Sequence, residues 1–180
     1  MAWPVTSSET VYENPWIRVV EDRVLRPDGD AGVYGVVEVR QSAVFIVAMT
    51  DADEVALVAV DRHTVGISLE VPAGGSDGQD ALEAARRELR EETGLIAEDW
   101  REVGRMDALN GICRAPETVF LARGLSRADD AAEGRHEEGI TDVRFVPWRE
   151  LLRLIAVGEI ADGETIAAVL FAAIALNRVA

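Results

Sequence analysis

Three glutamates, Glu88, Glu91 and Glu92, stand close together in the segment Arg87–Leu95 (RELREETGL). On an α-helix, side chains three and four residues apart share one face, so the three carboxylates are expected to point the same way. Carboxylates gathered in this manner repel one another, and a divalent cation among them would relieve the repulsion. Their oxygen ligands suit Mg²⁺ or Mn²⁺ rather than zinc. The spacing therefore predicts a magnesium or manganese site, with a solvated acidic helix face as the alternative.

Two features beside the glutamates favour the metal site. Arg87 lies one helical turn before Glu91, where its guanidinium can orient a carboxylate through paired hydrogen bonds. Ahead of the helix, Val71–Gly75 (VPAGG) is predicted to be a strand end followed by a glycine turn. Such a turn allows main-chain carbonyls to approach a metal closely. We therefore expect the acidic face to belong to a site rather than to an isolated charged surface.

A helix is predicted to carry these residues. Asp80 is placed to cap its start, Glu83 follows three residues later as in a capping box, and Gly94 comes just after its end. One side of the helix is expected to pack on the protein through Leu82, Ala85 and Leu89. The neighbouring side then presents the carboxylates.

The same segment resembles the signature of the Nudix hydrolases: a glycine, five residues, a glutamate, seven residues, then Arg-Glu-apolar-x-Glu-Glu-x-Gly-apolar. Arg87–Leu95 matches the second part at every fixed position. In the first part, the expected glycine falls on Ala73 and the expected glutamate on Gln79, so the Gly74–Asp80 loop is one residue short. A neutral amide at Gln79 lacks the charge of a carboxylate. The resemblance implies an α/β fold, an α/β/α sandwich with a mixed central sheet.

The resemblance also implies how the metal site is built. The three glutamates, Glu88, Glu91 and Glu92, are expected to hold two or three Mg²⁺ (or Mn²⁺) ions together with the main-chain carbonyl of Ala73. Arg87 and Glu91 are also expected to contribute to catalysis. Such ions would clamp the diphosphate of a substrate and activate a water molecule.

The polar segment Ser126–Gly139 is predicted to be a loop, because its composition cannot form a packed core. In the enzymes that this sequence resembles, a loop here carries a glutamate that acts as a base. The candidate is Glu138, or else its neighbour Glu137, and an ordinary solvated charge is the alternative for both. The resemblance further places Arg62 and Glu70 near the substrate, with an exposed rim position as the alternative for Arg62.

Residues 1–41 are predicted to form an N-terminal subdomain, and residues 42–180 the Nudix domain. The strands Trp16–Val24 and Val33–Arg40 would make a β-hairpin around a turn at Arg26–Asp30. This hairpin resembles the N-terminal sheet of the ADP-ribose pyrophosphatase branch, which mediates dimerisation, so a homodimer is expected. Three aromatic side chains are candidates either for stacking on a base or for packing in the core: Tyr12, Trp16 and Tyr34.

The remaining chain is predicted to form further strands and then two helices. The strands are expected over Ala43–Met49, Val55–Val60, Ile67–Pro72, Trp100–Leu109, Glu117–Ala122 and Thr141–Val146. The helices are expected over Pro147–Val157 and Asp162–Arg178. This order favours a sheet between helical layers.

The composition limits the partners of the protein. With 180 residues and a net charge of -15, the chain is not suited to sequence-independent binding of nucleic acid or of anionic membranes. Its longest apolar run, Ile166–Leu176, is well short of the roughly 20 residues that span a bilayer. Cys113 is the single cysteine, which rules out an internal disulfide and fits a reducing cytoplasm.

These observations predict hydrolysis of a nucleoside diphosphate linked to a second moiety. The resemblance implies ADP-ribose as the substrate, giving AMP and ribose 5-phosphate. Two alternatives stay open: another nucleoside diphosphate sugar such as GDP-mannose, or a module that senses such a nucleotide without cutting it. Gln79 and the short loop motivate the sensor, whereas the complete set Glu88, Glu91 and Glu92 favours the enzyme, because binding alone does not require all three.

Overall fold

The computed structural model describes residues 3–128 and 139–179 of the chain. The chain divides into two compact units. The N-terminal unit is formed by Met1–Ser42 and Asp107–Glu117, and the core unit by Ala43–Met106 and Thr118–Ala180. The N-terminal unit thus includes a segment that comes from the middle of the sequence.

The N-terminal unit is a four-stranded sheet in the order β1-β2-β3-β9. Its strands are β1 (Val5–Glu13), β2 (Ile17–Leu25), β3 (Ala31–Val39) and β9 (Cys113–Arg114). The first three are antiparallel neighbours, whereas β9 pairs with β3 in parallel. The expected hairpin is present as β2 and β3, with Gly29 at a φ of 90° in its turn. It is extended by β1 on one side and by β9 on the other.

Polar contacts attach β9 and the turn before it to the hairpin. Arg114 forms an ion pair with Glu38, and Glu38 also accepts a hydrogen bond of 2.6 Å from Nε of Arg18. The hydrogen bond from Arg18, and to a lesser degree the contact with Arg114, holds the pKa of Glu38 below its ordinary value. The hydroxyl of Tyr34 donates to the carbonyl of Gly111. These contacts hold β9 and the turn before it against β2 and β3.

The core unit contains two sheets, with strand orders β7-β4-β10-β8 and β11-β5-β6. Every strand expected from the sequence occurs, although β8 begins directly after the helix at Leu95 rather than at Trp100. The strand expected over Glu117–Ala122 continues to Arg127, so the first two residues of the predicted loop Ser126–Gly139 belong to β10. The bounds are β4 (Ala43–Ala48), β5 (Glu54–Arg62), β6 (Gly66–Glu70), β7 (Ala73–Gly75), β8 (Leu95–Asp107), β10 (Pro116–Arg127) and β11 (Ile140–Pro147). The apolar runs of β4 and β5 are buried, as expected for strands covered on both faces.

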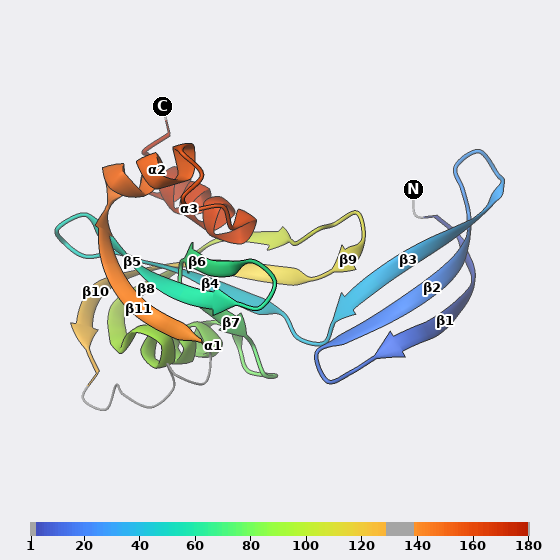
Figure 1. The fold of residues 1–180 in the computed structure, drawn as a ribbon, viewed down its shortest axis with the longest axis horizontal. Helices are drawn as coiled ribbons and strands as arrows, with labels where there is room; N and C mark the ends of the chain where they lie inside the picture. The colour runs from blue at the N-terminus through green and yellow to red at the C-terminus, as the bar shows by residue number, and fades with distance from the viewer. Residues whose placement is uncertain (1–2, 129–138, 180) are drawn as a thin grey trace. The chain divides into compact units, whose positions relative to one another are not determined.

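Helices cover the strands of the core unit on two sides, with α1 below them and α2 and α3 above them in Figure 1. The helices are α1 (Ala81–Glu88), continued by the π-helical turn η1 (Leu89–Thr93), then α2 (Trp148–Ala156) and α3 (Gly163–Ala175). One apolar cluster joins β4, β5 and β10 to α2 and α3. A second joins the strands to α1. The expected α/β/α sandwich is therefore confirmed.

The ends of the last two helices differ slightly from the expectation. Pro147 closes β11 and is the N-cap of α2 instead of its first helical residue, and α3 ends at Ala175 rather than near Arg178. Asp162 caps α3 as predicted, accepting a hydrogen bond of 2.7 Å from the main-chain N–H of Thr165. Among the described residues, no helix has the length and apolar character needed to cross a membrane.

Candidate active site

A pocket of about 350 Å³ opens in the core unit beside the acidic helix. Its walls come from β5, from β7 and the turn after it, and from α1 and η1. The lining residues are Val60, Arg62, Ala73, Gly74, Gly75, Asp77, Arg87, Glu88 and Glu92. Most of the residues expected in the metal site therefore meet in one place.

The helix that carries the glutamates begins and ends as its sequence predicts. Asp80 accepts a hydrogen bond of 2.9 Å from the main-chain N–H of Leu82, and Gly94 ends the helix at a φ of 73°. The side chain of Glu83, which the capping-box pattern directs toward the N-cap, accepts a hydrogen bond of 2.9 Å from Arg86. The cap is thus the Asp80 side chain, and Glu83 belongs to a surface ion pair.

The helix does not stay α-helical through all three glutamates. In η1 the hydrogen bonds span five residues, so each residue turns through a smaller angle than in an α-helix. This wider turn brings Glu92 over Glu88, and both side chains are buried and line the pocket. The carboxylate of Glu91 is 42% exposed, and Glu91 is not among the residues of the pocket wall. Two of the three glutamates, rather than all three, face the pocket.

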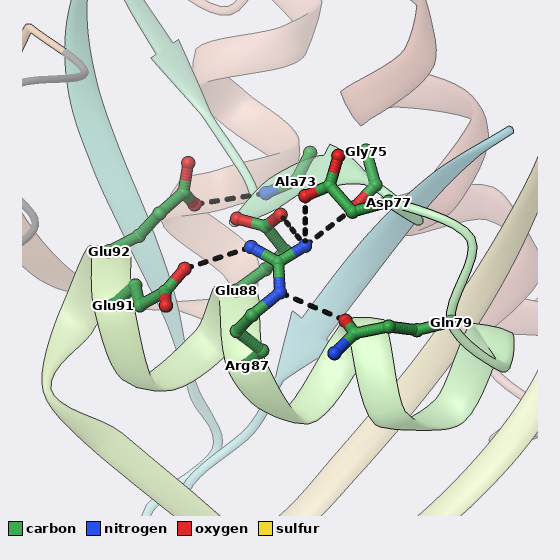
Figure 2. A network of polar contacts seen from close by, with 8 residues as sticks. All are labelled: Ala73, Gly75, Asp77, Gln79, Arg87, Glu88, Glu91 and Glu92. Carbon is green, nitrogen blue, oxygen red and sulfur yellow. Dashed lines mark hydrogen bonds and ion pairs between the residues drawn. The ribbon is translucent and has the colours of Figure 1, made fainter. Parts of the chain in front are cut away.

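Arg87 is the centre of the polar network in Figure 2. Its Nη2 lies 2.7 Å from the carbonyl oxygen of Gly75, 2.8 Å from Oε1 of Glu88 and 3.1 Å from Oδ2 of Asp77. Its Nη1 donates to Oε2 of Glu91 at 2.9 Å. Burial acts to lower the pKa of Arg87, but the nearby carboxylates outweigh it and hold that pKa above its ordinary value. The expected pairing of Arg87 with Glu91 is present within a larger network.

Gln79, which stands where the signature has a glutamate, takes part in this network. Its side-chain oxygen accepts a hydrogen bond of 3.1 Å from Nε of Arg87 (Figure 2). The short loop is closed by a hydrogen bond of 2.8 Å from the N–H of Gln79 to the carbonyl of Ser76. Asp77 and Gly78 occupy the left-handed backbone region there, at φ values of 49° and 76°. The neutral residue thus contacts Arg87 but brings no charge to it.

The glycine turn expected at Val71–Gly75 is instead a short strand, β7, which pairs with β4. The turn comes after it, at Asp77 and Gly78. No pattern in the sequence indicates a second role that the structure shows for Gly74. A Cβ at this position would come within 2.2 Å of the Glu88 carboxyl group. Because β7 and α1 approach so closely, Gly74 leaves room for that carboxylate.

The donors that line the pocket fit a hard divalent cation. Glu88 and Glu92 are buried carboxylates on one wall, and Ala73 lies opposite, where its N–H donates to Oε2 of Glu92 at 3.0 Å (Figure 2). Within residues 3–128 and 139–179, no three acidic, histidine or cysteine side chains are arranged so that they could hold an ion. Hard oxygen sites are completed by carbonyls and water as well as by carboxylates, so the chemistry of this donor set suits a hard divalent cation.

Arg62 and Glu70 form the second charged pair of the site. Nη2 of Arg62 lies 2.5 Å from Oε2 of Glu70, and Nε lies 3.2 Å from Oε1. The Glu70 carboxylate is buried, whereas Arg62 is half-exposed and lines the pocket. The hydrogen bonds to Glu70, opposed by burial, hold the pKa of Arg62 above its ordinary value, and the charges of Glu92 and Asp162 add to this effect. Arg62 is therefore a pocket residue held by a carboxylate.

A group that the sequence did not reveal lies at the start of α3. Burial raises the pKa of Glu164, and its hydrogen bond to Asp162 and the charge of Glu70 act in the same direction. Thr165 is fully buried, and its hydroxyl accepts a hydrogen bond of 3.1 Å from the N–H of Val71. The start of α3 is thus tied to the chain that links β6 and β7. No local pattern announces this contact, which joins residues 94 positions apart.

The remaining predicted site residues are two loop glutamates and three aromatic residues. Glu137 and Glu138 fall outside the described residues. Tyr12, Trp16 and Tyr34 belong to the N-terminal unit, where Tyr12 and Trp16 are 54% and 74% exposed. Tyr34 packs edge-on against the ring of Trp3. Packing in the core, the alternative for these aromatic side chains, is therefore wrong for Tyr12 and Trp16.

Comparison with protein families gives two matches along the chain. Residues 39–169 match the family model described as the NUDIX domain. Residues 3–37 match the model described as the nucleoside diphosphate sugar hydrolase N-terminal domain. The first match contains every residue of the pocket wall.

Individual proteins resemble the chain over most of its length. An ADP-ribose pyrophosphatase of Mycobacterium tuberculosis is 38% identical over 91% of this chain and 80% of the relative. An ADP-ribose pyrophosphatase of Bacillus subtilis is 27% identical over 88% of this chain and 86% of the relative. A methanol dehydrogenase activator of Bacillus methanolicus is 28% identical over 90% of this chain and 88% of the relative. A crystal structure of an ADP compounds hydrolase shares the fold with a TM-score of 0.86, at 22% identity, and covers 98% of this chain and 95% of its own.

Proposed function

Because this chain belongs to the Nudix family, we propose that it is a pyrophosphohydrolase that cleaves ADP-ribose to AMP and ribose 5-phosphate. The observation that carries the proposal is the pair of buried carboxylates, Glu88 and Glu92, in one pocket with the guanidinium groups of Arg62 and Arg87. The relatives named as ADP-ribose pyrophosphatases support the choice of substrate. The match to a nucleoside diphosphate sugar hydrolase N-terminal domain supports the same substrate class.

The reaction breaks one bond between phosphorus and the bridging oxygen of the diphosphate. A water oxygen forms a new bond to that phosphorus, the bridging oxygen leaves with the other phosphate, and the proton of the water passes to a base. Glu138 is the base we propose, and Glu137 is the neighbour that would replace it. Arg62 is half-exposed at the pocket wall, where it would bind a phosphate oxygen. Glu70 holds the Arg62 guanidinium in the orientation for this contact.

The proposed cofactor is Mg²⁺ or Mn²⁺, two or three ions per site. Glu88 and Glu92 would hold the ions with the carbonyl of Ala73, and Glu91, which is not part of the pocket wall, would be the third carboxylate of the site. Such ions neutralise phosphate oxygens and make water a better nucleophile. Arg87 keeps the carboxylates of Glu88 and Glu91 in place through the contacts of Figure 2.

Two other functions remain as alternatives to test. A different nucleoside diphosphate sugar, such as GDP-mannose, would use the same residues for the same chemistry. A sensor would bind the nucleotide without cutting it, and Gln79 and the short loop are the reasons to consider one. The contact of Gln79 with Arg87 weakens the first of these reasons, because the position still serves the network around the glutamates.

The experiment that tests the proposal offers several substrates to the purified protein with Mg²⁺ in water enriched in heavy oxygen. ADP-ribose, GDP-mannose, NADH, UDP-glucose, diadenosine polyphosphates and a nucleoside triphosphate are compared, with products analysed by mass spectrometry. We expect ADP-ribose to be cleaved fastest, with the heavy oxygen in one of the two monophosphates. Faster cleavage of GDP-mannose would move the substrate and keep the chemistry. Tight binding of ADP-ribose without cleavage of any substrate would favour the sensor.

We also propose a homodimer in a reducing, cytoplasmic setting. The N-terminal sheet supports the dimer, since β1 is exposed along its whole length and carries the exposed apolar side chains of Val5 and Val11. The single cysteine, Cys113, supports a reducing compartment, because the chain has no second cysteine for an internal disulfide. Light scattering of the wild type and of Val11→Lys tests the dimer. A wild type that is monomeric at every concentration would contradict it.

A further inference from the structure

Asp77 shares Arg87 with the buried glutamate of the pocket. Nη2 of Arg87 faces Oδ2 of Asp77 at 3.1 Å and Oε1 of Glu88 at 2.8 Å. The two carboxylates differ in environment, because the side chain of Asp77 is 61% exposed and that of Glu88 only 4% exposed. One guanidinium nitrogen is thus held by an outer and an inner carboxylate at the same time (Figure 2).

The charges around Arg87 explain why this sharing matters. Glu88 and Glu91 both contact the guanidinium, and both are proposed ligands of the cation. If the positive charge of Arg87 were balanced by these two carboxylates alone, it would repel a cation and so weaken cation binding by the carboxylates. The partner of Nε, Gln79, is neutral and removes none of that positive charge. Asp77 is the third carboxylate in contact with Arg87, and it adds to the charges that raise the pKa of that guanidinium.

The position of Asp77 follows from the short turn. Asp77 has a φ of 49°, a left-handed conformation that aspartate tolerates better than most side chains. The hydrogen bond from Gln79 N–H to the carbonyl of Ser76 closes the turn around it. The turn therefore presents a carboxylate and a neutral amide to two different nitrogens of Arg87.

We propose that Asp77 is a positioning residue that balances the charge of Arg87 and so leaves Glu88 and Glu91 able to attract a divalent cation. Asp77 and Gln79 together do what a single carboxylate at position 79 would do: one supplies the charge, and the other the hydrogen bond to Nε. This inference rests on the proposed function in one respect, which is that the pocket holds a cation. It assigns to Asp77 no contact with the substrate.

The test is a charge exchange between the two turn positions. Asp77→Asn keeps a side-chain oxygen but removes the charge, Gln79→Glu adds a charge on the other nitrogen, and the double variant moves the charge from one position to the other. Mn²⁺ binding is measured by calorimetry, and kcat and KM with ADP-ribose are measured separately. A third measurement needs no metal: the rate at which the Nε–H proton of Arg87 exchanges with solvent, followed by NMR in the metal-free protein.

We expect Asp77→Asn to weaken Mn²⁺ binding and to lower kcat by about tenfold, the lower end for residues that orient metal ligands, because Asp77 is largely exposed. The double variant should return both values to within about threefold of the wild type, because the two sites are coupled through Arg87. KM should change little. Exchange of the Nε–H proton should be faster in Asp77→Asn, although Asp77 contacts Nη2, because loss of the nearby negative charge favours the approach of the hydroxide that catalyses the exchange. It should be slow again in the double variant, which has a carboxylate on Nε.

Asp142→Asn is the matched control, because it breaks an exposed pair with Arg144 in the same unit and away from the pocket. It should leave Mn²⁺ binding and exchange at Arg87 unchanged. A double variant that is no better than Asp77→Asn would overturn the proposal, as would Mn²⁺ binding that does not change in Asp77→Asn. If neither the wild type nor any variant cleaves a substrate, the proposed activity is wrong. Mn²⁺ binding and proton exchange still decide the role of Asp77 in that case.

Discussion

Gly74 and Glu88 are in such close contact that a single methyl group would separate them. A Cβ built on Gly74 would lie 2.2 Å from the carboxyl carbon and from Oε1 of Glu88. Glu88 is buried between β7 and α1, so the carboxylate would have to move out of the pocket wall. We predict that Gly74→Ala weakens Mn²⁺ binding at least about tenfold, as expected when a metal ligand is displaced. Calorimetry with Mn²⁺ measures this.

A control separates the contact from the general effect of replacing a glycine. Gly163→Ala adds the same methyl group at the start of α3, where no atom of the described residues, apart from its chain neighbours and its own helix backbone, lies within 4 Å of it. We expect that variant to bind Mn²⁺ like the wild type. Equal binding by Gly74→Ala and the wild type would mean that the Glu88 carboxylate is not needed for the cation where it now lies.

Local signals in the sequence were sufficient for most of the fold. Asp80 and Gly94 mark the ends of the acidic helix because a cap and a left-handed glycine act on their own neighbours. The strands β4 and β5 are apolar runs buried on both faces, which makes their bounds visible. By contrast, β1 is absent from the predicted strands, because all nine of its residues are exposed and burial imposes no alternation on them.

The site was less predictable, because its geometry depends on contacts between distant residues. A regular α-helix would place Glu91 nearly as close to the pocket as Glu92, and the π-helical turn changes this without a signal in the residues that form it. The need for Gly74 arises only when β7 meets α1. The contact between Gln79 and Arg87 likewise depends on the turn between β7 and α1, so the sequence alone showed a missing charge and not the hydrogen bond that is kept.

The second prediction ranks the glutamates of η1. Glu92 is buried and lines the pocket, whereas Glu91 is partly exposed and pairs with Arg87. We predict that Glu92→Gln weakens Mn²⁺ binding by about 10–100-fold, and that Glu91→Gln has a smaller effect. The fold should survive Glu92→Gln, since an amide oxygen can still accept the hydrogen bond from the N–H of Ala73. Calorimetry and thermal unfolding of both variants decide the order, and equal losses would contradict it.

The third prediction concerns pH and the start of α3. Burial, helped by Asp162 and Glu70, raises the pKa of Glu164 above its ordinary value of 4.5. A carboxyl group whose pKa is raised by folding stabilises the protein fully below its unfolded pKa, and this contribution is lost as the pH rises through the folded pKa. We therefore predict that Glu164→Gln raises the Tm at pH 7, and that the gain disappears as the pH falls toward 4.5.

Glu150→Gln is the control for this test, because the pKa of Glu150 is shifted in the opposite direction. The hydrogen bond from Arg153 lowers the pKa of Glu150, so its charged form is favoured by folding and its loss cannot raise the Tm at pH 7. Thermal unfolding of both variants from pH 4 to pH 8 makes the comparison. A Tm of Glu164→Gln that follows the wild type at every pH would show that the carboxyl group is not destabilised in the folded protein.

The last prediction uses the pair formed by Arg62 and Glu70. If Arg62 binds a phosphate in the ground state and in the transition state alike, Arg62→Ala should raise KM for ADP-ribose by about tenfold or more with a smaller change in kcat. Arg62→Lys should recover only part of the loss, because an ammonium group cannot form the two-pronged contact with Glu70. Steady-state kinetics with the three proteins measures this.

Stability should then show how the two residues depend on each other. Arg62→Ala leaves the Glu70 carboxylate, 9% exposed, without the guanidinium that neutralises it, and a buried charge that loses its partner is strongly destabilising. Glu70→Gln made on top of Arg62→Ala removes that charge, so the double variant should unfold at a higher Tm than Arg62→Ala alone. Its KM should be no worse, because Glu70 acts on the substrate only through Arg62. The exposed pair of Glu150 and Arg153 is the control. Adding Glu150→Gln to Arg153→Ala should not raise the Tm. A double variant less stable than Arg62→Ala would mean that Glu70 is held by groups other than Arg62, and the carboxylate would then have a role of its own at the start of α3.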